Sequence, residues 1–194
     1  LENKGDTPVT LQVRTFAWSQ PNGQDRLDGQ EAVVASPPIT EVGPHARQLV
    51  RIIRRTTLPL PEAAYRLLID ELPPPPAGSD AAPAARLAVQ MRYSIPLFAL
   101  NAAPATGLAI GPRLEAEIRA GENGRVLHVR NNGAIHARLT DLRLIAGGRE
   151  TVVRGGLAGY VLPGSAVSLP LPAGETATVK VGVNGVDRIL GPTI

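Results

Sequence analysis

The chain has 194 residues, of which 43% are hydrophobic, and it carries a net charge of +3. This composition is typical of a folded protein, and the absence of cysteine excludes disulfides, thiolate metal ligands and a cysteine nucleophile. Basic residues are scattered and aromatic residues make up only 3%, so we expect no nucleic-acid partner.

Strand patterns begin close to the N-terminus. Residues 7–18, TPVTLQVRTFAW, alternate apolar and polar side chains, which predicts a strand. Residues 48–55, QLVRIIRR, are a further strand candidate, whereas residues 63–70, AAYRLLID, suit a strand or a helix. The chain opens abruptly at LENKGD without a signal peptide, which we interpret as a processed or trimmed N-terminus.

The clearest pattern covers residues 86–98, RLAVQMRYSIPLF, after a proline tract. Its odd positions are apolar and its even positions are mostly polar, which predicts a strand with one apolar face. That face could pack inside the protein's own sandwich. It could also lie on an exposed edge and be offered to a partner by β-augmentation. The pattern alone leaves both possibilities open.

The second half of the chain also consists of segments that predict strands. Short apolar segments are separated by Gly, Asn or Pro turns, at the spacing of about 8–12 residues that is typical of β-sandwiches. They include LEAEIRAG, GRVLHVRNNG, ARLTDLRLIAGG, TVVRGG, GYVLPGSAVSLPL and ATVKVGVNG. We place a domain boundary near Ala103 and predict an all-β protein with two sandwich domains, residues 1–102 and 103–194.

Side chains that could perform chemistry are sparse. The three histidines are His45, His128 and His136. The last two could meet across a hairpin, but Asp141 is the only carboxylate near them in the sequence, so we interpret them as surface histidines and expect no metal. Asp70 and Glu71 are adjacent and point to opposite faces of a strand, so they are no catalytic pair. No G-x-S-x-G motif is present, and we expect neither a cofactor nor an enzyme.

Several segments, in order along the chain, resemble the periplasmic pilus-assembly chaperones of the chaperone–usher pathway, the PapD-like family. Residues 1–18 are similar to that family's second strand, with an N-x-G-D-x-P turn and a terminal Trp18. Further similar segments are residues 35–52, 58–76, 90–98 and 127–144. Each segment alone is weak evidence for the resemblance, but the whole set in this order along the chain is specific to the family.

The resemblance implies two immunoglobulin-like sandwiches in a boomerang arrangement, with the first strand of domain 1 apparently missing. Residues 86–98 then correspond to the long G1 strand, which the family inserts into a pilin subunit that lacks its own final strand. The implied donor row is Leu87, Val89, Met91, Tyr93 and Ile95. The implied partners are pilin or fimbrial subunits and an outer-membrane usher, in the periplasm. We also expect the free row to be capped, by a second copy of the chain or by the preceding proline-rich loop.

The sequence departs from the family at the subunit's carboxylate anchor. The family holds that carboxylate with an arginine on the first strand and a lysine just before the L-F of the G1 motif, and the lysine position here reads Pro96. The sequence Ser94-Ile95-Pro96, in place of a basic residue, is similar to the archaic or spore-coat-type branch of the family. Arg92, on the polar face of the strand, is the candidate anchor, and its alternative is a solvated arginine. Glu71 matches a family glutamate that implies a structural role between the domains.

Two other functions compete with the chaperone interpretation. A structural or adhesive β-sandwich protein, such as a pilin or adhesion module, would bury the apolar row within its own chain. A carbohydrate-binding or accessory enzyme module is less favoured, because one Trp and three Tyr supply few flat platforms for sugars.

Overall fold

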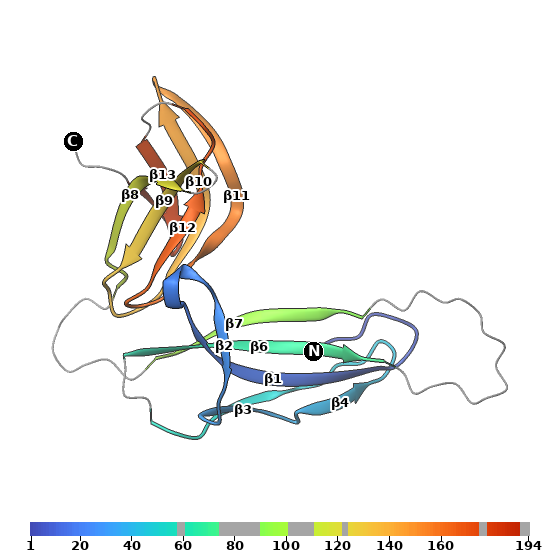
Figure 1. Ribbon diagram of the computed structural model, residues 1–194. Helices are drawn as coiled ribbons and strands as arrows, with labels where there is room; N and C mark the ends of the chain where they lie inside the picture. The colour runs from blue at the N-terminus through green and yellow to red at the C-terminus, as the bar shows by residue number, and fades with distance from the viewer. Residues whose placement is uncertain (58–60, 74–89, 101–110, 122–123, 175–177, 191–194) are drawn as a thin grey trace. The chain divides into compact units, whose positions relative to one another are not determined.

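The computed structural model describes residues 1–57, 61–73, 90–100, 111–121, 124–174 and 178–190 (Figure 1). The regular secondary structure of these residues consists of strands and one short 3-10 turn, η1 (Pro21–Gly23), with no α-helix. The prediction of an all-β protein is therefore confirmed. The described residues form no helix with the length and apolar character that a membrane span requires.

The chain folds into two compact units, which are described separately. Unit 1 comprises Leu1–Trp18, Leu27–Leu58 and Ala64–Ala99, and unit 2 comprises Ser19–Arg26, Pro59–Ala63 and Leu100–Ile194. Unit 2 thus includes two short segments from the first half of the chain. The predicted boundary between residues 102 and 103 lies outside the described residues.

Unit 1 is built from two antiparallel sheets. The larger has the order β2-β1-β6-β7, with β4 also paired to β1, and the smaller consists of β3 and β5. The strands are β1 (Val9–Ser19), β2 (Arg26–Gly29), β3 (Val33–Ser36), β4 (Ile39–Val42), β5 (Arg51–Arg54), β6 (Glu62–Leu72) and β7 (Arg92–Leu100). The segment that suited a strand or a helix therefore forms a strand, β6.

Alternation along β1 and β6 gives unit 1 its core. Val13 lies opposite Ile69 in the β1–β6 register, and both side chains are buried. Thr15 follows Val13 on the same face, and its hydroxyl donates to the carbonyl of buried Val33 on β3 (2.6 Å). This bond ties the larger sheet to the smaller one.

Unit 2 is a seven-stranded sandwich. One sheet has the order β11-β10-β13-β14 and the other β12-β9-β8. The strands are β8 (Leu114–Gly121), β9 (Gly124–Asn131), β10 (Ala137–Ala146), β11 (Arg149–Val161), β12 (Ala166–Pro170), β13 (Thr178–Val183) and β14 (Val186–Leu190). Both sheets contribute to one buried apolar cluster, with Leu127 and Val129 from β9 facing Leu139, Val179 and Val181. This is the arrangement of an immunoglobulin-like sandwich.

Strand β11 differs from the sequence-based expectation, which places a turn at Gly155–Gly156. The strand runs through both glycines, and its register against β10 shifts in this region. Gly156 adopts a positive φ of 67°, and its N–H donates to the Asp141 carboxylate (2.8 Å). The glycines therefore form a bulge, which lets the strand bend without reversing.

Candidate functional site: the edge strand β7

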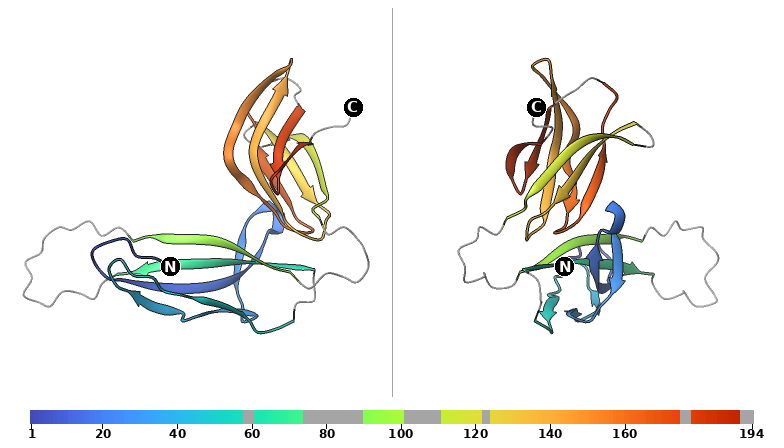
Figure 2. Two further views of the ribbon diagram at one scale, coloured as in Figure 1. Left: turned by 180° about the vertical axis from the view of Figure 1, so that it is seen from behind. Right: turned by 60° about the vertical axis from the view of Figure 1, so that its left-hand side comes forward.

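Strand β7 lies at the border of the larger sheet of unit 1, where β6 is its only partner among the described strands (Figure 2). The pairing begins where the N–H of Glu71 donates to the carbonyl of Met91 (2.9 Å). The other side of β7 pairs with no described strand, and an edge of this kind can accept a strand from another chain.

The apolar row at the start of β7, which begins with Met91 just before the strand, is about half exposed to water. Met91, Tyr93 and Ile95 keep 47%, 51% and 44% of their surface exposed. Other apolar side chains of the chain, such as Leu49 and Ile189, are more exposed, so it is the position of this row along an edge strand that marks it as a contact surface. Leu87 and Val89, the other two members of the predicted row, lie outside the described residues. The described part of the row is therefore available for contact rather than packed into the unit 1 core.

The polar face of β7 carries a cluster of two guanidinium groups around one carboxylate. Arg92 Nε donates to Asp70 Oδ1, and Arg14 Nη2 donates to Asp70 Oδ2 (2.7 Å). The Arg92 bond and then the Arg14 bond lower the pKa of the Asp70 carboxyl. Asp70 is 11% exposed in its side chain, whereas Arg92 is 64% exposed. Arg92 is therefore neither freely solvated nor buried, and its outer donors face solvent.

A cavity of about 330 Å³ adjoins this cluster and is lined by Gln12, Arg14, Asp70, Gln90 and Arg92, among others. The Nε atom of Arg14 is buried and has no hydrogen-bond partner within the described part of the chain. A buried donor without an acceptor is costly, but this atom is closed off from solvent, so a ligand in the cavity could reach it only if the Arg14 side chain moved.

Glu71 lies beside the start of β7. Its carboxylate accepts a long bond from the N–H of Met91 (3.4 Å), and its own N–H pairs with the same residue. These contacts lie within unit 1. The role between the domains that the resemblance implies for Glu71 stays a prediction.

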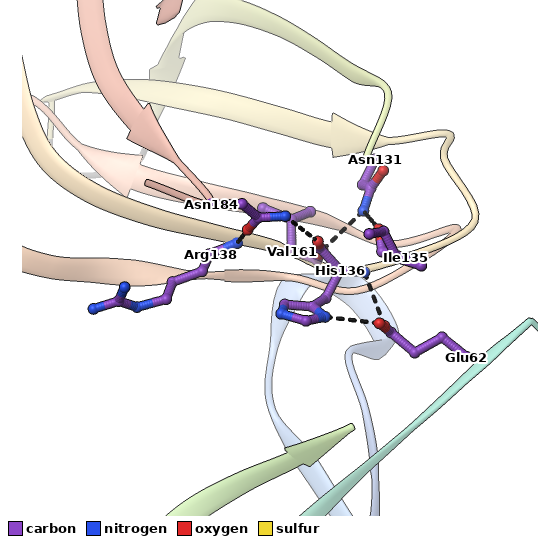
Figure 3. A network of polar contacts seen from close by, with 7 residues as sticks. All are labelled: Glu62, Asn131, Ile135, His136, Arg138, Val161 and Asn184. Atoms are coloured by element: carbon purple, nitrogen blue, oxygen red, sulfur yellow. Dashed lines mark hydrogen bonds and ion pairs between the residues drawn. The ribbon is translucent and has the colours of Figure 1, made fainter. Parts of the chain in front are cut away.

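A second carboxylate, which the sequence analysis did not single out, is Glu62 in unit 2 (Figure 3). Its side chain is 1% exposed. One oxygen accepts from the backbone N–H of His136 (2.8 Å) and the other from its imidazole Nδ1 (2.8 Å). The side chain of Asn184 links the same turn, because it donates to the carbonyl of His136 (3.1 Å) and accepts from the N–H of Arg138 (2.7 Å).

The histidines are therefore placed differently from the sequence-based expectation. His136 is not a plain surface residue, because its imidazole is 20% exposed and bonded to a buried carboxylate. His128 contacts Ser168 (3.2 Å) instead of His136, and His45 contacts Asp6 (3.0 Å). Within the described ranges, no three His, Cys, Asp or Glu side chains gather as a metal site would require.

Comparisons with known proteins agree with this geometry. Residues 1–103 match the family model "Pili and flagellar-assembly chaperone, PapD N-terminal domain". One chain in the crystal structure of a CsuC–CsuE chaperone–tip adhesion subunit complex from Acinetobacter baumannii is similar, with TM-score 0.76 and 26% identity over 98% of this chain and 88% of that chain.

Two further structures share the fold at lower identity. The CupB2 chaperone of Pseudomonas aeruginosa gives a TM-score of 0.62 and 22% identity over 98% of this chain and 90% of the other. The DraB chaperone of E. coli gives a TM-score of 0.58 and 21% identity over 97% and 83%. No sequence among the curated proteins matches this chain.

Proposed function

This chain belongs to the family of pili and flagellar-assembly chaperones with a PapD N-terminal domain, and we propose that it captures pilin or fimbrial subunits by donating strand β7. Its general role is that of a chaperone in pilus assembly, as the family match and the similar structures indicate. The observation that carries the proposal is the half-exposed row of Met91, Tyr93 and Ile95 on an edge strand.

Strand donation follows from the physical chemistry of an incomplete sandwich. A subunit that lacks one strand exposes apolar core and rows of unpaired backbone groups. Each large side chain that β7 inserts would contribute about 1.5–3 kcal/mol by burial. The added ladder bonds would satisfy the backbone groups on both edges. In this proposal Leu87 and Val89 extend the row toward the N-terminal end of the strand.

The partners in the similar structures support this class of ligand. The Acinetobacter structure is a pre-assembly complex of a chaperone with a tip adhesion subunit. A Salmonella enterica structure holds the SafA pilin in complex with the SafB chaperone. By family membership, we place this chain in the periplasm, where it would deliver subunits to an outer-membrane usher. Without a subunit, a second copy of the chain would cap β7.

We propose Arg92, together with Arg14, as the anchor for the subunit's terminal carboxylate. Two features support this choice: the cavity that both side chains help to line, and the exposure of 64% of the Arg92 side chain. Guanidinium groups bind carboxylates in a bidentate manner. In the free chain Asp70 already accepts a hydrogen bond from each of the two arginines. An incoming carboxylate would therefore have to share these donors with Asp70.

The test is co-expression with a pilin subunit followed by affinity purification. The double variant Met91→Asp with Tyr93→Asp is expected to abolish capture, because a subunit core cannot accept two unpaired carboxylates. Ser94→Asp, compared with the single variant Tyr93→Asp, is the matched control, since each adds one carboxylate to the same strand but on opposite faces. Far-UV circular dichroism should show all these variants folded. Capture by the double variant at the wild-type level would reject strand donation.

A further inference from the structure

Unit 2 contains a polar cleft of its own, with a volume of about 850 Å³. One wall is the loop around η1, and the other is formed by β9 and by β12 with the turn that precedes it. All the lining residues belong to unit 2. The cleft is as large as the sites that hold drug-sized ligands, and strand donation by β7 does not use it.

The loop wall is held in place by the side chain of Gln20, which is 7% exposed. Its Nε2 donates to the Asp25 carboxylate (3.0 Å) and to the carbonyl of Tyr160 (3.0 Å), and its Oε1 accepts from the N–H of Leu162 (2.9 Å). Every polar atom of this side chain is therefore bonded. Such a network fixes the loop on the sandwich before any ligand arrives.

Close backbone packing completes the wall. Gly23 has a φ of +77°, and a Cβ at this position would lie 3.0 Å from the carbonyl oxygen of Ala166 on β12. A larger residue would be strained there and would push the loop off the strand. The cleft is thus a preformed feature with a rigid wall, which reduces the entropy cost of binding.

The described residues that line the cleft are rich in hydrogen-bond donors and include no carboxylate. They carry the guanidinium groups of Arg26 and Arg130, together with amide and hydroxyl side chains such as Gln24 and Ser165. Glu115 lies opposite Arg130 on β8, yet Arg130 makes no ion pair in the described part of the chain. The cleft therefore offers positive charge that an anionic ligand can neutralise.

The imidazole of His128 adds a further polar group to the floor, where it contacts the hydroxyl of Ser168 (3.2 Å). Burial, and then the charge of Arg119, lower the pKa of His128. At neutral pH the imidazole is therefore uncharged and can donate or accept a hydrogen bond.

We propose that this cleft binds an acidic, extended peptide segment of a partner protein, with Arg130 as the principal charged contact. Carboxylate side chains would bond to the guanidinium groups, while the amide and hydroxyl side chains would bond to the peptide backbone. Among the described residues, no Phe, Tyr or Trp side chain lines the cleft, which counts against stacked sugars or bases. The inference stands independently of strand donation by β7.

Fluorescence anisotropy with the full chain tests this proposal. The probe is a fluorescein-labelled peptide of alternating Asp and Glu, and its comparison is the matching Asn and Gln peptide, both at low ionic strength and neutral pH. The acidic peptide is expected to bind at least about tenfold more tightly than the neutral one. Added salt should weaken binding of the acidic peptide.

Matched charge variants distinguish binding in the cleft from a general attraction of the acidic peptide to a basic protein. Arg130→Gln is expected to weaken binding of the acidic peptide about tenfold. Arg149→Gln, which removes the same charge from an exposed position on β11, should change it less than about twofold. Ser168→Glu places a carboxylate in the cleft and should also weaken binding, which provides a second variant if Arg130→Gln proves unstable.

Three results would overturn the proposal. The first is equal binding of the acidic and neutral peptides, or no binding of either. The second is an equal loss with Arg130→Gln and Arg149→Gln, which would show attraction to net charge only. The third is tighter binding of a sulfated oligosaccharide than of the acidic peptide with the same dependence on Arg130, which would replace the peptide by an anionic sugar. None of these measurements depends on subunit capture by β7.

Discussion

Glu62 and Asp70 are buried carboxylates, one in each unit, and each is held by specific donors. A buried charge is expensive unless hydrogen bonds replace its hydration. Glu62 receives two bonds from His136, and Asp70 receives bonds from Arg14 and Arg92. Removing the charge from either carboxylate should therefore affect stability more than changes to exposed charges do.

Glu62→Gln is expected to lower the free energy of unfolding by about 1–3 kcal/mol. The amide keeps one acceptor oxygen for the backbone N–H of His136, but its NH₂ group can bond to Nδ1 only if the imidazole changes tautomer. Urea unfolding followed by circular dichroism measures the effect. Glu150→Gln is the control, because Glu150 is 42% exposed and pairs with surface cations, so its loss should cost less than about 1 kcal/mol. Equal costs for the two variants would contradict the role assigned to Glu62.

Asp70→Asn is expected to lower the free energy of unfolding by about 1.5 kcal/mol at neutral pH. Bonds from Arg92 and Arg14 hold the pKa of Asp70 below its ordinary value of 3.8. A lowered pKa stabilises the fold above that ordinary value, and this stabilisation is lost as the pH falls through the folded-state pKa. The difference in the free energy of unfolding between wild type and variant should therefore stay constant down to about pH 5 and then shrink in stronger acid. Urea unfolding across this pH range measures this dependence. A stability difference of the same size in strong acid would contradict the role assigned to the Asp70 charge.

At the scale of elements, the turns of unit 2 explain both a success and an omission of the sequence analysis. Period-two alternation correctly located most strands, but β14 was not anticipated. Asn184 and Gly185, with φ of 50° and 87°, form the hairpin turn between β13 and β14. An Asn-Gly pair is the strongest short hairpin signal, so this strand could have been found from the sequence.

The turn after β9 gives a prediction at this scale. A Cβ on Gly133 would lie 2.4 Å from the carbonyl oxygen of Gly111 and 2.5 Å from the backbone nitrogen of Arg113. Asn131 stabilises this close approach of the two backbone segments, since its Oδ1 accepts hydrogen bonds from the N–H groups of Arg113 and Gly133. Gly133→Ala must therefore displace backbone, and we expect a loss of about 1–3 kcal/mol.

Gly155→Ala serves as the control for this variant, because a Cβ at Gly155 on β11 meets nothing within 4 Å. Thermal unfolding of the two variants compares them directly. Midpoints that fall equally would show that loss of glycine flexibility, and not the close approach at Gly133, causes the effect.

At the scale of the whole molecule, the two units have unequal cores. In unit 2 one buried apolar cluster draws on both sheets. In unit 1 the described buried set is smaller, and β7 keeps its apolar row in water. Because burial of apolar surface is the main stabilising term, unit 1 should be the less stable of the two.

Trp18 is the only tryptophan, and it is buried in unit 1, so its fluorescence reports on that unit. We expect the fluorescence transition in urea to occur at a lower concentration than the main transition in circular dichroism, which reports on both units. A bound pilin subunit should move the fluorescence transition upward. Coincident transitions by both probes would show that the two units unfold as one.

The sequence by itself determined the all-β class and the apolar face of the strand that ends in β7, because alternation and turn residues act between neighbours in the chain. It also placed Arg92 on the opposite face from Tyr93. Only the tertiary structure decided that β7 is an edge, that Asp70 lies between Arg14 and Arg92, and that Glu62 binds His136. These contacts join residues 22 to 74 positions apart, and they depend on strand order and register, which local patterns do not specify.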